Sequence, residues 1–476
     1  MNLSKPFIQR PVMTVLVMAS MILFGIFGYK TLPISDLPNV DFPTITVSAA
    51  LPGASPETMA TSVATPLEQQ FSSIPGIDSM NSSSTLGNTQ ITLQFNQNRN
   101  IDGAALDVQA AISAASKQLP TNLPYQPTFK KVNPASFPIV YLVLSSSTQP
   151  LYVVDDYASN YLAQKISMIN GVAQVNILGS KKLAVRIQLD PKELAAKNIG
   201  INEVSNAIQG NNSNLPTGVL DGEHQSFLIQ ANGQLENAKF YRPLIVTYRN
   251  GLPLRLENIG QVIDSVENTK IGSWYNGKEA IVLGIQKQPG TNTIEISDNI
   301  KKLLPAFEKQ LPKGIHLDIA YDRSEFIKTS IHDVQFTLLL ASVFVVIIIY
   351  LFLGNILVTL IPSIVLPITI LCTFAMMKLL DFSINNLTLL ALTLSVGYIV
   401  DDAIVMLENI FRYLEKGDPP LQAALKGSKE ISFTILSMTL SLAVVFIPVI
   451  FLDGLLGKLL YEFGITIFCA IIVSGF

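Results

Sequence analysis

The stretch that decides the fold is LTLLALTLSVGYIVDDAIVML, residues Leu387–Leu407. It is apolar and long enough to cross a bilayer as a helix, which takes about 20 residues. It nevertheless contains two adjacent aspartates, Asp401 and Asp402. An ionised carboxylate near the middle of a span costs roughly 2.5 to 3.5 kcal/mol on insertion scales. Two in succession predict partners or a wet cavity inside a helical bundle, so this pair is the leading functional site.

The spacing of the two aspartates limits what they can do. Neighbours on a helix point about 100° apart, so both carboxylates can face one cavity and titrate as a coupled unit. Gly397, one turn earlier on the same face, would let another helix approach closely. A structural ion pair with Lys or Arg of another helix is an alternative, although one carboxylate would suffice for it. An intramembrane aspartyl protease is disfavoured, because its two carboxylates face each other across a water, usually from different helices.

Five other apolar stretches, together with this one, predict a bundle of six membrane-spanning helices. They lie at Val12–Tyr29, Val334–Gly354, Ile356–Met377, Ile431–Leu452 and from about Phe463 to Phe476. The mean hydropathy is +0.40 and charged residues make up 14%, against roughly 25% in soluble domains. The sixth stretch is shorter than the roughly 20 residues that a crossing needs. We therefore expect the chain to be the amino-terminal half of a larger protein, or a truncated product.

Basic residues near the ends of the spans predict the orientation, because they are retained on the cytoplasmic side. Lys5 and Arg10 precede the first span, which we interpret as an uncleaved signal anchor. The connection between the fourth and fifth spans contains Arg412, Lys416, Lys426 and Lys429. The amino terminus is then cytoplasmic, and the long segment between the first two spans lies outside the cytoplasm.

That segment alternates strand-like and helix-like patterns. The first module is expected from a strand at Pro43–Leu51, a helix at Pro56–Ile74, a strand at Gln90–Phe95 and a helix at Ala104–Leu119. The second is expected from Pro138–Ser145, Asp155–Ile169, Val172–Leu178, Ala280–Gln286, Thr293–Gln310 and Ile315–Tyr321. The order β-α-β-β-α is that of a split βαβ module. About 90 residues, from Lys181 to Lys270, interrupt the second module.

The predicted fold is an α-helical transmembrane bundle plus α+β subdomains of split βαβ, ferredoxin-like type, with an inserted subdomain. The predicted divisions are 1–30, 31–136, 137–180 with 271–330, 181–270, and 331–476. Within the insertion, Asn211–Gly222 (NNSNLPTGVLDG) is a run of turn formers with few large apolar residues. Such a run is either an arm that packs on another subunit or a mobile loop, and spacing alone favours the loop.

Composition and motifs exclude several function classes. A net charge of −3 without a basic patch excludes a nucleic-acid binder. Cys372 and Cys469 lie in apolar runs, which argues against a disulfide or a thiolate metal site. The three histidines, His224, His316 and His332, lack ligand spacing. The segment GSWYNGK (Gly272–Lys278) resembles a P-loop, but Glu279 follows where Ser or Thr is required. Since hydrolase and metalloprotease signatures are also missing, we expect no enzyme.

Five stretches resemble the resistance-nodulation-division (RND) family, in its hydrophobe/amphiphile multidrug efflux branch of AcrB-like permeases. They are PGASPETM (Pro52–Met59), SIHDV (Ser330–Val334), TLIPSIVLP (Thr359–Pro367), FSINNLTLLAL (Phe382–Leu392) and GYIVDDAIVMLENI (Gly397–Ile410). Their order and spacing cover essentially the whole chain. The segment LENIFRYLEKGDPPLQAALKG (Leu407–Gly427) looks closest to MdtB/MdtC-like permeases.

The resemblance implies a trimeric pump of the Gram-negative inner membrane that exchanges protons for hydrophobic or amphiphilic drugs and needs no cofactor besides the proton gradient. Its partners would be RND permease subunits in a homo- or heterotrimer, a periplasmic adaptor and an outer-membrane channel. Asp401 and Asp402 would form the proton relay with a lysine and hydroxyl residues from the second half. The two α+β modules would be porter subdomains, and the insertion would be half of a docking subdomain.

The resemblance also bears on smaller sites. It favours the arm over the mobile loop, with Asn211, Asn214, Pro216 and Gly218 reaching into a neighbouring protomer. Phe137 matches a phenylalanine of the drug pocket, whereas Leu178 stands where AcrB-like members have another, and core packing is the alternative for both.

Two other functions stay open. A heavy-metal exporter of the same family would need a cluster of methionine or carboxylate ligands in the porter region, but the only methionines between the first two spans are Met59, Met80 and Met168, too few for a thioether site. An inactive truncated product would at most form assembly contacts.

Overall fold

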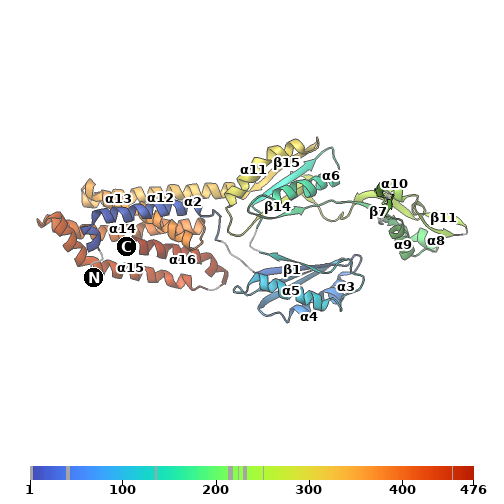
Figure 1. Cartoon of the computed structure of the whole chain (residues 1–476), viewed down its shortest axis with the longest axis horizontal. Helices are drawn as coiled ribbons and strands as arrows, with labels where there is room; N and C mark the ends of the chain where they lie inside the picture. Colours follow the sequence, from blue (N-terminus) through green and yellow to red (C-terminus); the bar gives the residue numbers. More distant parts are fainter. Residues whose placement is uncertain are drawn as a thin grey trace.

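The computed structural model describes residues 4–38, 43–133, 137–212, 218–222, 224–228, 233–249, 251–452 and 454–475. Within these residues, six helices are long and apolar enough to cross a membrane. They are α2 (Pro11–Thr31), α12 (Arg323–Leu353), α13 (Ile356–Leu379), α14 (Asn386–Glu415), α15 (Pro420–Ile450) and α16 (Gly454–Gly475). A short α1 (Lys5–Gln9) precedes them. The six lie alongside one another at one end of an elongated molecule (Figure 1). The predicted bundle is therefore confirmed.

The sixth span is longer than the sequence predicted. Helix α16 begins at Gly454, and its apolar portion Leu456–Gly475 has 20 residues, enough for a crossing. The prediction that this stretch begins near Phe463 and is too short is wrong. Lys458 and Glu462 interrupt the apolar pattern and hid the first turns of the helix. The Glu462 side chain is nonetheless buried within the bundle.

A first α/β module follows α2. Its strands are β1 (Thr44–Ala50), β2 (Ile77–Thr85), β3 (Asn88–Phe95) and β4 (Thr128–Val132), in the antiparallel order β2-β3-β1-β4. Its helices are α3 (Pro56–Met59), the π-helical turn η1 (Ala60–Ala64), α4 (Thr65–Phe71) and α5 (Ile101–Ala115). Ser55 caps α3 by accepting a hydrogen bond from the Thr58 amide at 3.2 Å. Alternation along β3 buries Ile91, Leu93 and Phe95 against the helices.

A second α/β module repeats this strand order. Its strands are β5 (Val140–Ser146), β6 (Val172–Leu178), β13 (Ser273–Tyr275), β14 (Lys278–Lys287) and β15 (Ile315–Asp322). Strand β14 lies between β5 and β6, and β15 borders β5. The helices are α6 (Leu151–Asp156), the π-helical turn η2 (Tyr157–Leu162), α7 (Ala163–Ser167) and α11 (Thr293–Gln310). In both modules a strand, a helix and a strand are followed by a strand, a helix and a strand.

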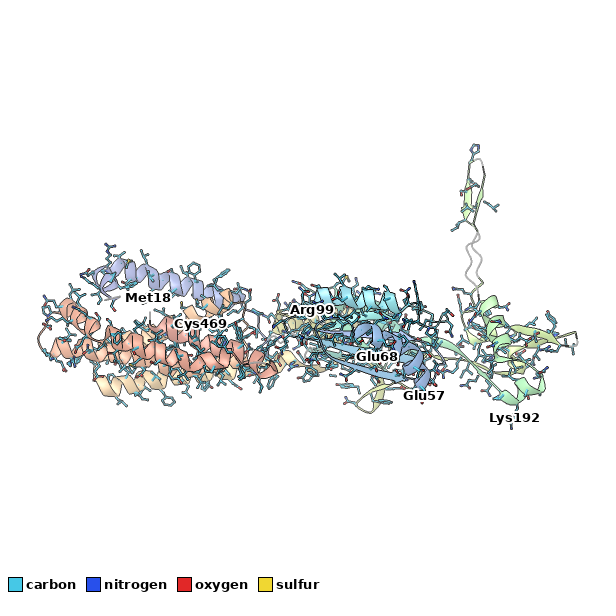
Figure 2. The ribbon with its side chains drawn as sticks, turned by 90° about the horizontal axis from the view of Figure 1, so that it is seen from below. Met18, Glu57, Glu68, Arg99, Lys192 and Cys469 are labelled. Atoms are coloured by element: carbon cyan, nitrogen blue, oxygen red, sulfur yellow. The ribbon has the colours of Figure 1, made fainter. Side chains whose placement is uncertain are left out.

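A third unit lies between β6 and β13, with a core of its own. Its elements are β7 (Leu183–Leu189), α8 (Pro191–Ala196), α9 (Ile201–Asn211), β8 (Val219–Asp221), β9 (Ser226–Leu228), α10 (Ala238–Tyr241), β10 (Ile245–Arg249), β11 (Leu252–Arg255), η3 (Leu256–Asn258) and β12 (Gly260–Val266). Its core includes Val204, Leu256 and Ile259. This unit lies at the end of the molecule opposite the bundle (Figure 1). The hairpin of β8 and β9 projects away from it (Figure 2).

Asp322 stabilises the junction between β15 of the second module and α12 of the bundle. It caps α12 by accepting a hydrogen bond from the Ser324 amide at 2.8 Å, and its carboxylate lies 2.6 Å from the Lys301 ammonium. The Ser297 hydroxyl also donates to it, at 2.9 Å. Burial opposes ionisation of Asp322, but the hydrogen bonds from Lys301, Ser324 and Ser297 outweigh burial and hold its pKa below the ordinary value.

Replacing this cap, Asp322→Ala, is expected to lower the free energy of unfolding by about 1 kcal/mol, the usual value of a lost N-cap. Since the pKa of Asp322 is lower in the folded state, its stabilisation is present above the unfolded pKa and is lost as the pH falls through the folded value. Thermal unfolding in detergent should thus separate wild type from variant at neutral pH and bring them together in acid. The exposed Asp318 on the same strand provides the control, Asp318→Ala. A difference that persists unchanged in acid would contradict this role of the carboxylate.

Candidate functional site

The acidic pair lies in the second half of α14, and its two carboxylates differ in surroundings. A capping box at Asn385 starts this helix, which then runs without interruption to Glu415. Asp402 is half-buried, and its Oδ2 accepts a hydrogen bond from the Thr439 hydroxyl of α15 at 3.2 Å. Asp401 is exposed within this chain. The adjacent aspartates therefore point in different directions, one into the bundle and one out of it.

Helix α16 holds the Thr439 side of this site in place. The Ser474 hydroxyl donates to the Ile399 carbonyl of α14 at 3.1 Å. A Cβ added at Gly475 would lie 2.8 Å from Cγ2 of Thr439, so the backbone of α16 packs directly on the Thr439 side chain of α15. Asp402 thus faces a junction of α14, α15 and α16. Sequence reasoning missed Thr439, because an isolated threonine in an apolar helix carries no signal of its own.

The other side of α14 is an open face, which we define as Leu390, Leu394, Gly397 and Asp401. These positions follow one another at helical spacing, and all four are exposed. A Cβ added at Gly397 would meet nothing within 4 Å among the described residues. The close helix approach predicted at Gly397 is therefore not found within the part of the chain that the structure describes. The face leaves room for another helix beside Asp401.

A third intramembrane carboxylate, Glu462, was missed by the sequence analysis. It lies on α16, is 9% exposed and accepts hydrogen bonds at Oε2 from Asn385 Nδ2 at 2.7 Å and from the Ser383 hydroxyl at 3.3 Å. The signal was present, because a carboxylate between two apolar runs is as unusual as the aspartate pair. Hydropathy alone misses Glu462 because it places the start of the last span near Phe463, just after this carboxylate.

The residues expected at a drug pocket, Phe137 and Leu178, lie on the second module and are both exposed. Leu178 ends β6 and pairs with Val282 of β14, whereas Phe137 precedes β5. The chain is not part of the strand at Phe137, and the ring of the next residue, Pro138, lies over Gly284 of β14, where an added Cβ would be 3.3 Å from its Cγ. The residue of β14 beneath Pro138 and the pairing partner of Leu178 are thus two positions apart, so both predicted pocket residues border this strand.

The expected arm is described only in part. Asn211 ends α9, where its Nδ2 donates to the Ala207 carbonyl at 2.8 Å. Gly218 has a φ of 81°, a left-handed conformation that glycine adopts without strain, and it leads into β8. Asn214 and Pro216 lie outside the described residues. The hairpin exposes four large apolar side chains, Val219, Leu220, Phe227 and Leu228.

The methionines and histidines are dispersed. Met59 is fully buried in the first module's core, Met80 packs against that core, and Met168 is exposed on the second module. The three histidines are exposed. Among the described residues, no three His, Cys, Asp or Glu side chains are grouped so as to hold a metal ion. Cys372 and Cys469 are free thiols within the bundle.

The comparison with known protein families agrees with this architecture. A family model described as the AcrB/AcrD/AcrF family matches residues 3–476. The match includes all six apolar helices, the three α/β units between α2 and α12, and the acidic pair on α14. The chain is a membrane protein of the RND transporter type, and it belongs to the AcrB/AcrD/AcrF family.

Proposed function

We propose that the chain is the amino-terminal half of a proton-driven multidrug efflux transporter, which exchanges protons for hydrophobic or amphiphilic substrates across the inner membrane of a Gram-negative bacterium. The observation that carries this proposal is the divided environment of the acidic pair. Asp402 binds Thr439 inside the bundle, while Asp401 lies on the open face of α14. One pair of titratable groups thus borders two separate helix interfaces.

The proposed mechanism uses that division. Proton binding at the pair removes a charge from α14, which changes its hydration and its packing against α15 and against a helix on the open face. Moving one charge through 100 mV is worth about 2.3 kcal/mol, enough to bias a choice between two helix packings. A lysine of the second half is the proposed relay partner beside Asp401. Thr439 is the proposed hydroxyl partner that this half supplies.

The extramembrane units have the corresponding proposed roles. The two α/β modules act as porter subdomains in the periplasm, and the third unit acts as half of a docking subdomain for an outer-membrane channel. A periplasmic adaptor completes the assembly. Phe137 and Leu178, both exposed on the second module, are proposed to contribute apolar contacts to the substrate path.

The placement of the methionines supports drugs over metal ions as the substrate. Thioether ligation needs sulfurs that converge on one point. Met59 lies in the first module's core, Met80 packs against that core, and Met168 lies on the second module. The three sulfurs therefore do not converge on one point, which supports recognition of apolar substrates over thioether ligation of a metal ion.

Reconstitution of the assembled permease in liposomes tests the proposal. An imposed pH gradient should drive movement of an amphiphilic cationic dye, and a protonophore should stop it. Copper(I) and zinc ions, assayed in the same vesicles, should not move. Metal transport without dye transport would favour the heavy-metal exporter, and transport of neither would favour an inactive product.

The projecting hairpin is the proposed contact between protomers of a trimer. Val219, Leu220, Phe227 and Leu228 give it an apolar surface that a solitary loop would not need. This composition supports the arm over the mobile loop.

Introducing charge on this arm, Leu220→Asp together with Phe227→Asp, is expected to weaken the trimer by at least about tenfold in its dissociation constant, because burial of apolar contacts is lost and charge must be desolvated. Analytical ultracentrifugation in detergent measures the effect. The matched control is Leu252→Asp, an exposed leucine on β11 away from the hairpin, which should leave the trimer intact. Equal assembly of both variants would exclude the arm as the contact.

A further inference from the structure

A cluster of polar side chains lies buried at the end of the bundle that faces the α/β modules. Its centre is Glu462 of α16, whose Oε2 accepts hydrogen bonds from Asn385 Nδ2 at 2.7 Å and the Ser383 hydroxyl at 3.3 Å. All three side chains are less than 10% exposed. Burying a carboxylate is unfavourable unless donors compensate it, so the two donors mark a specific interaction rather than chance proximity.

One amide joins this carboxylate to the start of α14. While Asn385 Nδ2 donates to Glu462, its Oδ1 accepts hydrogen bonds from the amides of Leu387 and Thr388, each at 3.0 Å. The Thr388 hydroxyl accepts in turn from the Asn385 amide at 2.9 Å. A shift of the first turn of α14 relative to α16 would therefore disturb Glu462 and the helix cap together.

The same cluster contacts the connector, which we define as residues Pro33–Asp36 between α2 and the first module. The Ser35 amide donates to the Ile384 carbonyl at 3.1 Å, and the Ile384 amide donates to the Pro33 carbonyl at 2.9 Å. The hydroxyls of Ser35 and Ser383 are 3.3 Å apart. The loop that carries Ser383 and Asn385 is thus paired with the connector through backbone and side chains.

The connector in turn reaches the second module. The Ile34 carbonyl accepts a hydrogen bond from the Thr293 amide, at the first turn of α11, at 3.0 Å. Asp36 forms an ion pair with Arg323, the first residue of α12. A continuous set of contacts therefore runs from α16, through the cap of α14, to the connector and the base of the second module.

We propose that Glu462 is a positioning residue that holds the cap of α14 against the connector, so that movements of α14 driven by its acidic pair reach the α/β modules. This inference rests on the proposed function, which assigns the proton step to α14. Glu462 acts as a hydrogen-bond acceptor in this role, and the proton itself is carried elsewhere. The hydrogen bonds that join Glu462, the cap of α14 and the connector are buried and few. Loss of any one of them is therefore expected to weaken the coupling between α14 and the α/β modules.

Two substitutions of Glu462 separate an acceptor from a proton carrier. Glu462→Gln keeps an oxygen for Asn385 Nδ2, and the turnover number for dye export should remain within about twofold of wild type. Asn385 Nδ2 also donates to the Ser383 hydroxyl at 2.8 Å, so Glu462→Leu leaves one of its two N–H groups without its acceptor. The turnover number should then fall roughly tenfold or more with little change in KM. Size-exclusion chromatography in detergent confirms that each variant assembles.

Exchanging the hydrogen-bond donor and acceptor between Asn385 and Glu462 gives a more specific test of their contact. Asn385→Asp keeps the oxygen that caps α14 but places a second carboxylate oxygen opposite Glu462, so export should fall. Adding Glu462→Gln supplies an amide donor for that oxygen, and the double variant should regain most of the export. Rescue by exchange of the two partners is not expected of side chains that merely fill space.

Hydrogen exchange of backbone amides tests the contacts of Glu462 without a transport assay. The backbone amides of Ser35, Ile384 and Asn386 should exchange faster in Glu462→Leu than in wild type, and at the wild-type rate in Glu462→Gln. If Glu462→Gln is as defective as Glu462→Leu and the swap fails, Glu462 carries a proton and the inference is wrong. Unchanged export and exchange in Glu462→Leu would also overturn it. Should wild type move no dye, the proposed function fails, while the exchange rates still decide whether Glu462 holds the connector.

Discussion

Replacing either member of the acidic pair, Asp401→Asn or Asp402→Asn, is expected to reduce proton-coupled export by about a hundredfold or more, the scale on which removal of a proton-transfer group acts on a rate. The amide has the shape of the carboxylate but cannot exchange a proton near neutral pH. Asn at 402 can still accept the hydrogen bond from Thr439, and position 401 is exposed in this chain. Packing should therefore survive while coupling is lost.

The measurement is the initial rate of dye efflux in proteoliposomes under an imposed pH gradient, together with the amount of folded permease. Glu408→Gln is the matched control, because Glu408 lies on the same helix and is exposed near its end, away from the Thr439 contact. We expect wild-type export from this control. Export at the wild-type rate by either Asn variant would show that the relay assignment is wrong.

The alternative of a structural ion pair makes a different prediction for the same variants. If the aspartates only hold a Lys or Arg of another helix, each Asn variant should leave a buried cation unpaired and lower the yield of folded protein. The permease that does fold would then keep its proton coupling. A double substitution that neutralises both partners would restore the yield. The ratio of export rate to folded protein thus separates a relay from a structural pair.

Hydropathy and alternation were sufficient to predict most of the secondary structure. The strand expected at Gln90–Phe95 is found as β3, Asn88–Phe95. Alternating apolar and polar residues favour a strand because successive side chains of a strand point to opposite faces, so that all the apolar ones are buried on one face. The helix expected from Pro56 begins there, with Ser55 as its cap. Alternation and helix capping depend only on residues that are neighbours in the chain, so a single sequence is enough to predict them.

Contacts between elements could not be predicted in the same way. Sequence spacing pointed to Gly397 as a site of close helix approach, yet among the described residues the close approaches of helix backbones include Gly25, Gly28 and Gly427 and not Gly397. Thr439 could not be identified from the sequence, because its hydrogen bond to Asp402 depends on how α15 packs against α14. The start of α16 was misplaced because Lys458 and Glu462 resemble the end of an apolar run, and only the folded bundle supplies the donors that allow Glu462 to be buried.

The largest expected effect on folding concerns the packing of α2 on α13. A Cβ at Gly25 would overlap the backbone carbonyl of Leu371, and one at Gly28 would lie 2.9 Å from the carbonyl oxygen of Phe374. The helices therefore touch backbone to backbone, as small residues allow in membranes. Gly25→Ala already requires the helices to move apart, at about 1 to 3 kcal/mol for overpacking. Gly25→Leu should prevent the pair from forming and abolish the folded state.

The measurement is thermal unfolding of the purified chain in detergent, with the yield of monodisperse protein as the second readout. Gly397→Ala is the matched control, because it lies in an apolar helix of the same bundle with nothing within 4 Å of the added carbon among the described residues. It should leave the stability of this chain unchanged. Stability of Gly25→Ala equal to that of this control would contradict the close contact of α2 and α13. The control also reports on the open face, since Gly397→Ala should impair the assembled permease only if a further helix packs beside Asp401.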